Sequence, residues 1–263
     1  MYSLSDLRSI SISRISSNNM ILALTRSVIF YIVIFFFSIF WNSLSIILGI
    51  FLPYRQRYWL VITVWTSTFI WLLKIICGVR YEVTGKENIP EQACLVSSNH
   101  QSSWETFFLQ SICTPQSQVI KRELLWIPFF GWAYSILKPI AIDRADKRSA
   151  REQVMEQGCS YLRSGIWVLI FPEGTRKQPG HLGKFAKGAA GLAKEANVSV
   201  LPVAHNSGQY YINKEFIKYP GTVYVTIGKP ISSEDKDIES LNDEMHRWTE
   251  QALKAIYTKS KLS

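Results

Sequence analysis

His100 and Glu105 are the residues of this sequence whose types and spacing are best suited to chemistry. Both lie in the run from Ser98 to Glu105, just after an apolar stretch typical of a strand. An imidazole titrates near pH ~6.5 and can take a proton from an alcohol, while a carboxylate at its other ring nitrogen fixes the tautomer and stabilises the imidazolium. Neighbours on one helix face are three or four residues apart, so we expect His100 in a loop and Glu105 in the first turn of the next helix.

The same segment also allows a purely structural interpretation. Ser102 and Glu105 have the spacing of a capping box, in which the glutamate reaches back to the N–H of the serine that caps the helix. A lone His and Glu pair is common, so the spacing alone leaves both a catalytic dyad and a helix cap open. No G-x-S-x-G elbow is present, which disfavours Ser102 and Ser103 as nucleophiles.

Three further segments follow this one in order. They are Gly131 through Ile142-Asp143-Arg144, then Phe171-Pro172-Glu173-Gly174-Thr175-Arg176, and then Leu201-Pro202-Val203-Ala204. Together with Asn99-His100-x-x-x-x-Glu105, they resemble the four ordered blocks of the glycerolipid acyltransferases, and the lysophosphatidate acyltransferases most closely. The usual family pattern has Asp where this chain has Glu105, which is longer by one methylene and keeps the carboxylate chemistry.

The resemblance implies an acceptor site in the third block. Its members Glu173, Gly174, Thr175 and Arg176 would bind the glycerol phosphate acceptor together with Arg144. Gly174 can take φ > 0, and an arginine can hold a phosphate with two parallel hydrogen bonds. A glutamate repels a phosphate at contact, so we assign Glu173 to a glycerol hydroxyl or to holding Arg176.

Four more cations are candidates for extending this anion site. A solvated or membrane-facing basic surface is an equal alternative for them. They are Lys121, Arg122, Lys184 and Lys187.

The activity that the resemblance implies is acyl transfer from acyl-CoA or acyl-carrier protein to the free hydroxyl of lysophosphatidate, forming phosphatidate. His100 would deprotonate the hydroxyl and Glu105 would orient the imidazole, with no covalent intermediate, metal or cofactor implied. Two alternatives stay open. The acceptor could be another lysolipid such as lyso-ornithine lipid, or the chain could be a non-catalytic membrane protein that binds lipid.

The composition narrows the classes of molecule that this protein could bind. The 263 residues carry 29 basic and 20 acidic side chains, a net charge of +9, which suits either nucleic acid or anionic membrane lipid. The hydrophobic N-terminal third favours lipid, and no nucleic-acid-binding signature is present. The four cysteines lack CxxC or metal-ligand spacing, and we interpret them as reduced core residues.

The N-terminal third predicts a membrane-associated helical hairpin. Residues 28–52 contain no charged side chain and are long enough to cross a bilayer, and residues 58–73 form a second, shorter apolar run. Arg55 and Arg57 would lie in the distant turn of a fully spanning hairpin, so we favour one that enters from the cytoplasmic side and is partly immersed. The expected location is the bacterial inner membrane, with the active site on the cytoplasmic face. A hairpin buried in a soluble core is the alternative.

The rest of the chain predicts an α/β fold with a mixed, largely parallel sheet flanked by helices. Helices are expected at 146–163 and 234–256. The expected strands are 81–84, 93–97, 118–120, 139–142, 166–171, 198–203 and 222–227. The predicted organisation is a disordered segment 1–19, an anchor 20–78 and an acyltransferase domain 79–263, with Met20 as the expected natural start. Residues 183–191 lack the P-loop pattern, which excludes that kind of nucleotide site.

Overall fold

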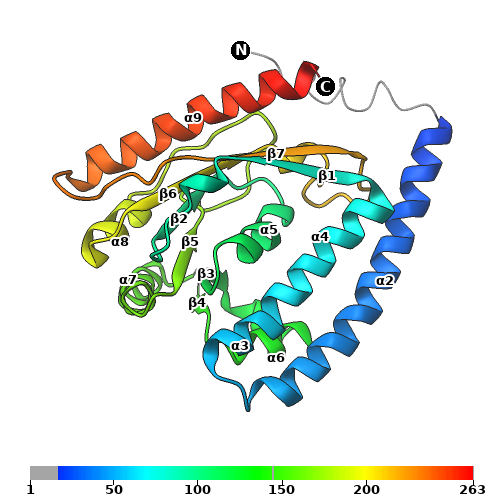
Figure 1. Ribbon diagram of the computed structural model, residues 1–263, viewed down its shortest axis with the longest axis horizontal. Coiled ribbons are helices and arrows are strands. Elements are labelled where there is room, and N and C mark those ends of the chain that lie inside the picture. The colour runs from blue at the N-terminus through cyan, green and yellow to red at the C-terminus, as the bar shows by residue number, and fades with distance from the viewer. Residues whose placement is uncertain (1–16, 144, 263) are drawn as a thin grey trace.

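The computed structural model describes residues 17–143 and 145–262, and its centre is a seven-stranded sheet (Figure 1). The strand order is β1-β7-β6-β2-β5-β3-β4. Neighbours β6 and β7 are antiparallel, and the other neighbouring pairs are parallel. The strands are β1 (Val79–Thr84), β2 (Leu95–Ser98), β3 (Gln116–Lys121), β4 (Ile140–Ile142), β5 (Trp167–Ile170), β6 (Val200–His205) and β7 (Gly221–Ile227). Each of the seven predicted strands is present, and the mixed, largely parallel α/β fold is confirmed.

Helices cover both faces of the sheet. Successive strand residues point to opposite faces, so Val96 and Leu201 pack in one hydrophobic cluster while Leu95 and Val200 pack in another. The first cluster lies beneath α2 (Ser17–Gly49), α4 (Val64–Cys77) and α5 (Trp104–Ile112), and the second beneath α7 (Lys147–Arg163), α8 (Gly188–Ala196) and α9 (Ile238–Leu262). Shorter elements are α3 (Tyr54–Tyr58), the π-helical η1 (Trp59–Thr63), η2 (Lys86–Asn88), η3 (Arg122–Trp126), α6 (Phe130–Ser135) and η4 (Ser207–Gln209).

Capping residues explain where the two predicted C-terminal helices begin. Asp146 caps α7 by accepting a hydrogen bond from the N–H of Ser149, as the sequence suggests. The expected start of the last helix was wrong by four residues, because Asp237 accepts the N–H of Ser240 at 2.7 Å and α9 begins only at Ile238.

The N-terminal helices form the predicted hairpin and pack along the α/β domain (Figure 1). By length and composition, α2 and the arm from Tyr54 to Cys77 could each cross a bilayer. In their most apolar windows, only 22% of the residues of α2 are buried, whereas 56% of those of the second arm are buried. The second arm is therefore mostly a packed helix, while α2 keeps a long apolar face exposed.

The tip of the hairpin is docked on the domain. Arg57 donates hydrogen bonds to the carbonyls of Gly49 and Leu52 in the turn and, at 3.1 Å, to the carbonyl of Ile136 beyond α6. The buried hydroxyl of Tyr58 donates to the carbonyl of Gln110 in α5. The charge of Arg57 in the turn is thus satisfied by the protein's own carbonyl groups.

The anchor and the sheet share one hydrophobic core. Phe30 of α2 and Leu73 of α4 belong to the same cluster as strand residues Val96 and Leu201. The boundary at residues 78 and 79 therefore separates elements that pack on each other, and it stays a prediction as a domain boundary. Of the predicted disordered segment, residues 1–16 lie outside the described part of the chain, and the last three belong to α2.

Candidate active site

The sheet topology places the sequence blocks at one edge. In the parallel set β2, β5, β3 and β4, the carboxyl ends of the strands meet at the same edge, where α/β sheets bind ligands. His100 follows β2, the segment from Phe171 to Arg176 follows β5, and Lys121 ends β3. Arg144 follows β4 in the sequence but lies outside the described residues.

Both the ring and the backbone of His100 are fixed by contacts with neighbouring residues. Its Nδ1 is 2.9 Å from Oε1 of Glu105, and its ring stacks on Phe171 with centroids 4.0 Å apart. Its backbone N–H donates to Glu173, and its carbonyl accepts from the N–H of Lys177 at 2.7 Å. Because Nδ1 faces a carboxylate acceptor, it carries the proton, which leaves the lone pair on Nε2. Among the described residues Nε2 has no hydrogen-bond partner, and the side chain is 15% exposed.

Glu105 is fully buried, and both of its carboxylate oxygens are saturated with donors. Oε1 accepts from His100 Nδ1 and from the backbone N–H groups of Gln101 and Ser102, at 2.8 and 2.7 Å. Oε2 accepts from the hydroxyls of Ser102 and Ser207. Burial raises the pKa of Glu105, but the hydrogen bonds that its carboxylate accepts from His100 and Ser102 favour the charged form and hold the pKa below its usual range.

The helix cap and the dyad are both present in this geometry. The N–H of Ser102 donates to Glu105, and the Ser102 hydroxyl accepts from the N–H of Trp104 at 3.0 Å, which together give a capping interaction at the start of α5. The same Glu105 oxygen that accepts from Ser102 also meets His100. The Glu105 carboxylate therefore accepts hydrogen bonds from the backbone that precedes α5 and also contacts the imidazole of His100.

Glu173 supports the histidine loop through the backbone. Its Oε1 accepts from the N–H of His100 at 2.9 Å, and its Oε2 accepts from the N–H of Gly183 at 2.8 Å. Burial raises the pKa of this carboxyl, and the two backbone hydrogen bonds oppose that rise. The described contacts of Glu173 are thus with main-chain amides, whereas Arg176 has other partners.

Arg176 lies beside the histidine loop and is exposed. Its guanidinium donates to the hydroxyl of Ser103 at 3.0 Å and to Oδ1 of Asn213 at 3.1 Å. Gly174 has φ +67, the left-handed conformation expected for it, and a Cβ there would meet nothing within 4 Å. Thr175 is exposed next to it. The turn therefore presents a guanidinium and open main chain to solvent at the His100 edge.

Lys121 is less closely tied to this group. It lies at the same edge of the sheet but forms an exposed ion pair with Glu123 at 3.1 Å. No described contact joins it to His100, Glu105 or Arg176.

Sequence reasoning missed the residues that brace the dyad from the far side. Asn99 exchanges two side-chain hydrogen bonds of 3.0 Å with the backbone of His205, and His205 Nε2 donates to the carbonyl of Asn99 at 2.9 Å. Because Nδ1 of His205 accepts from the N–H of Ser207, this buried ring is neutral. Ser207 then reaches Glu105. Asn99 was visible as part of the motif, whereas nothing near Ser207 in the sequence signals its role.

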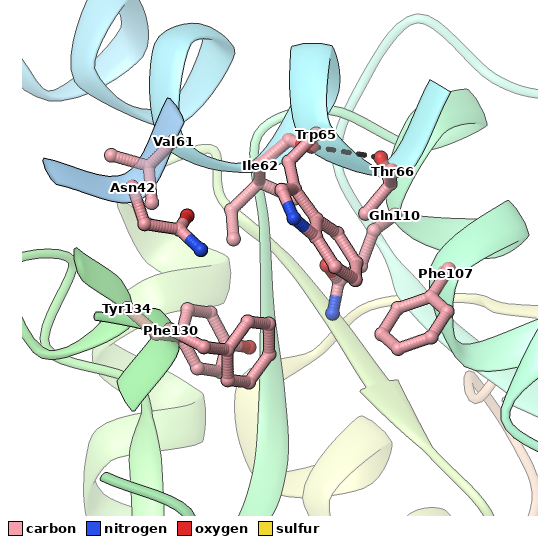
Figure 2. A pocket seen from close by; sticks show the side chains of 9 residues that line it. All are labelled: Asn42, Val61, Ile62, Trp65, Thr66, Phe107, Gln110, Phe130 and Tyr134. Carbon is pink, nitrogen blue, oxygen red and sulfur yellow. Dashed lines mark hydrogen bonds between the residues drawn. The ribbon is translucent and has the colours of Figure 1, made fainter. Parts of the chain in front are cut away.

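A narrow cavity lies between the anchor helices and helices α5 and α6 (Figure 2). Figure 2 shows Trp65, Phe107 and Phe130 around it, with the Asn42 side chain at one end. Its volume is about 20 Å³, roughly that of a single water site, so it cannot hold a substrate in this conformation. The open edge of the sheet at His100 is the better candidate for the reacting groups.

Known proteins resemble the segment of the chain that carries this site. The acyltransferase family model matches residues 80–206, which include His100, Glu105 and the segment from Glu173 to Arg176. The 1-acyl-sn-glycerol-3-phosphate acyltransferase of Pseudomonas aeruginosa is 47% identical over 234 residues, covering 88% of this chain and 91% of that protein. The mouse 1-acyl-sn-glycerol-3-phosphate acyltransferase alpha is 33% identical over 180 residues, covering 65% of this chain and 62% of its own length.

A solved structure shows the same fold. The crystal structure of the 1-acyl-sn-glycerophosphate (LPA) acyltransferase PlsC from Thermotoga maritima superposes with a TM-score of 0.77 at 22% identity, covering 90% of this chain and 97% of that one. That coverage extends beyond the family-model match, which begins only at residue 80. The chain belongs to the 1-acyl-sn-glycerol-3-phosphate acyltransferase family.

Proposed function

We propose that this protein transfers a fatty acyl group from a thioester, acyl-CoA or acyl-carrier protein, to the free hydroxyl of lysophosphatidate, forming phosphatidate. The observation that carries this proposal is the His100 and Glu105 pair. Their contact of 2.9 Å leaves the unprotonated nitrogen of the imidazole at the open edge of the sheet. A general base placed in this way matches the step that acyl transfer to an alcohol requires.

The reaction balances without a covalent enzyme intermediate. The acceptor hydroxyl attacks the thioester carbonyl while His100 Nε2 takes its proton, so a C–O bond forms and the C–S bond breaks. The imidazolium, stabilised by Glu105, then returns the proton to the departing thiolate. The products are an ester and a free thiol, and the imidazole is ready for another turnover.

The acceptor phosphate fits best beside Arg176. This guanidinium is exposed, and its contact with Ser103 places it in the same loop region as His100. Gly174 and Thr175 provide open main chain and a hydroxyl next to it. Glu173 acts here mainly by fixing the backbone of His100. We assign Arg144 and Lys121 to the outer part of the anion site, a role suggested by their positions after β4 and at the end of β3.

The exposed apolar face of the hairpin supports a location of this site at a membrane surface. The exposed face of α2 carries large apolar side chains along its length, including Phe36 and Phe40 at 66% exposure each. The tip is docked on α6 through Arg57, so a hairpin that spans the bilayer would carry α6 into the membrane with it. We therefore infer a partly immersed hairpin on the cytoplasmic face of a bacterial inner membrane, where anionic lipid attracts a chain of net charge +9.

A transfer assay on the purified full-length chain tests the proposal. Lysophosphatidate in detergent micelles is supplied with acyl-CoA or with acyl-carrier protein, and the thiol released and the lipid formed are measured together. The expected result is equal amounts of thiol and phosphatidate, with loss of both in His100→Ala. Lyso-ornithine lipid as an alternative acceptor tests the lipid class. Lipid binding without consumption of thioester would overturn the proposal and indicate a binding protein.

A further inference from the structure

A second basic site lies away from His100, where the hairpin joins the sheet. A groove of about 490 Å³ runs between the start of α2, the end of α4 and the first residues of β1 and β7. In Figure 1 this junction is where α4 passes into β1 beside the upper part of α2. The lining residues are Arg26, Lys74, Ile75, Ile76, Gly78, Arg80, Pro220, Gly221 and Thr222. None of them belongs to the histidine loop or to the turn that carries Arg176.

Three cations from three different elements converge on this groove. Arg26 comes from α2, Lys74 from α4 and Arg80 from β1, and no carboxylate is among the lining residues. Within residues 17–143 and 145–262, none of the three forms an ion pair, whereas Lys187 and Lys259 each pair with a glutamate. Like charges gathered without a counter-charge repel one another and attract an anion.

Two glycines are among the residues that line the groove. Gly78 and Gly221 meet there, and the N–H of Gly221 donates to the carbonyl of Gly78 at 3.1 Å. Gly78 has φ +72, and a Cβ on Gly221 would lie 2.0 Å from the ring of Tyr210. Both positions thus require glycine, because Tyr210 and Pro220 occupy the space that a Cβ would take.

The surroundings of the cations indicate a lipid rather than a free anion. Side chains three or four residues apart share one helix face, and each helical cation has exposed apolar neighbours at that spacing. Trp71 lies one turn before Lys74, while Leu22 and Ile29 lie on either side of Arg26. Cations beside exposed apolar side chains are suited to a phospholipid at the bilayer boundary, because the charged headgroup of the lipid lies next to its apolar acyl chains.

We propose that this groove binds the phosphate headgroup of an anionic phospholipid, with the acyl chains of that lipid lying against the exposed apolar side chains of α2 and α4. This inference rests on the proposed function, because it assumes that the apolar face of α2 meets a membrane. The site is distinct from the acceptor site at Arg176. A lipid held there would fix the orientation of the hairpin, and with it the sheet edge that carries His100, relative to the bilayer surface.

Vesicle binding of the full-length chain tests the groove. Cosedimentation is compared between pure phosphatidylcholine vesicles and vesicles of equal parts phosphatidylcholine and phosphatidylglycerol. The test variant combines Arg26→Gln, Lys74→Gln and Arg80→Gln, and Lys74→Gln with Arg80→Gln alone leaves the half-buried Arg26 in place. Each cation at an anionic surface contributes severalfold to binding, so the gain from phosphatidylglycerol should fall by about ten- to a hundredfold in the triple variant.

A matched control removes the same charge elsewhere. Lys86→Gln, Arg163→Gln and Arg247→Gln also delete one lysine and two arginines, all of them exposed, from η2, α7 and α9. Charges more than ~10 Å from the lipid are largely screened, so this control should keep most of the gain. Equal losses in the two triple variants would show that only net charge matters, and an undiminished gain in the groove variants would show that the groove binds no lipid. Either result overturns the proposal.

Two further measurements distinguish failure of the groove proposal from failure of the proposed function. Transfer to micellar lysophosphatidate should be unchanged in the groove variants, because the groove shares no residue with the His100 site. An inactive wild-type chain would overturn the proposed function and leave the vesicle result intact. Melting temperatures of all variants exclude unfolding as the cause of lost binding, and the double variant decides the outcome if the triple variant is destabilised.

Discussion

The hydroxyl of Ser207 donates a hydrogen bond of 2.7 Å to Oε2 of Glu105, across 102 residues of sequence. It also lies 2.8 Å from the hydroxyl of Ser102, which contacts the same oxygen. The two oxygens of the carboxylate are therefore divided between two tasks. Oε1 accepts from His100 and from the backbone of the loop, and Oε2 accepts from two serine hydroxyls that lie next to each other.

Ser207→Ala is expected to lower kcat by about ten- to a hundredfold with little change in KM. A hydrogen bond to a buried charged group is worth ~1.5–3 kcal/mol, and its loss frees one oxygen of the group that orients His100. A lost donor leaves more of the negative charge of the carboxylate facing His100 and so favours the protonated imidazole, and the acidic limb of the kcat profile should also move to higher pH. The measurement is kcat as a function of pH.

Ser97→Ala is the matched control for this variant. Ser97 is also a buried serine near the end of its strand, but its hydroxyl has no hydrogen-bond partner within the described part of the chain. Its removal should leave both kcat and the pH profile close to wild type. Similar pH profiles for the two serine variants would show that Ser207 has no positioning role.

Glu105→Gln is expected to reduce kcat by about 10²–10⁴-fold and also to lower the melting temperature, because the depressed pKa of Glu105 means that its charge stabilises the fold. The glutamine amide oxygen can still accept the N–H groups of Gln101 and Ser102, and the serine hydroxyls can turn to accept from its amide nitrogen. What is lost is the negative charge that stabilises the imidazolium. Glu105→Asp should retain part of the activity, because the charge remains but sits one methylene farther from His100.

The kcat of the glutamine variant separates the two roles of Glu105. If the carboxylate acted only as a helix cap, the glutamine variant would keep near-normal turnover, since glutamine is also accepted at that position of a capping box. Near-normal kcat in the glutamine variant, whatever its melting temperature, would therefore contradict the dyad.

Arg176→Gln is expected to raise the KM for lysophosphatidate by about tenfold and to change the KM for the thioester little. The guanidinium is exposed, so solvent screening reduces the contribution of a charge pair with phosphate, while the two parallel hydrogen bonds are lost. Arg163→Gln, an exposed arginine on α7, is the control. An acceptor KM equal to that of the control would place the phosphate elsewhere.

Local sequence pattern was sufficient to locate the strands and to place His100 and Glu105 in the chain. Short runs of residues that favour strands located each strand of the sheet, and the five-residue spacing correctly placed His100 in a loop and Glu105 in the first turn of α5. Both properties depend on neighbours in sequence, through strand periodicity and helix capping. The choice between a cap and a dyad could not be made at that level, because the structure uses the same carboxylate for both.

Long-range contacts were outside the reach of such reasoning. Ser207, the partners of Arg176 and the docking of Arg57 on Ile136 all join segments that are remote in sequence. A serine or an asparagine on a loop has no distinguishing pattern until the fold brings it to its partner. Glu173 was assigned from its charge to a glycerol hydroxyl or to Arg176, yet the structure shows its oxygens accepting from backbone amides.

Two phenylalanine variants of α2 are expected to separate membrane attachment from folding. Phe36 and Phe40 are each 66% exposed, so replacing both with glutamine should weaken partition into phosphatidylcholine vesicles while the melting temperature changes little. Phe30 on the opposite face is fully buried against Phe69, with ring centroids 5.2 Å apart, and Phe30→Ala should cost ~3–5 kcal/mol of folding stability. Cosedimentation and thermal melting check both expectations. Unchanged partition of the Phe36→Gln, Phe40→Gln variant would show that this face of α2 does not enter the lipid.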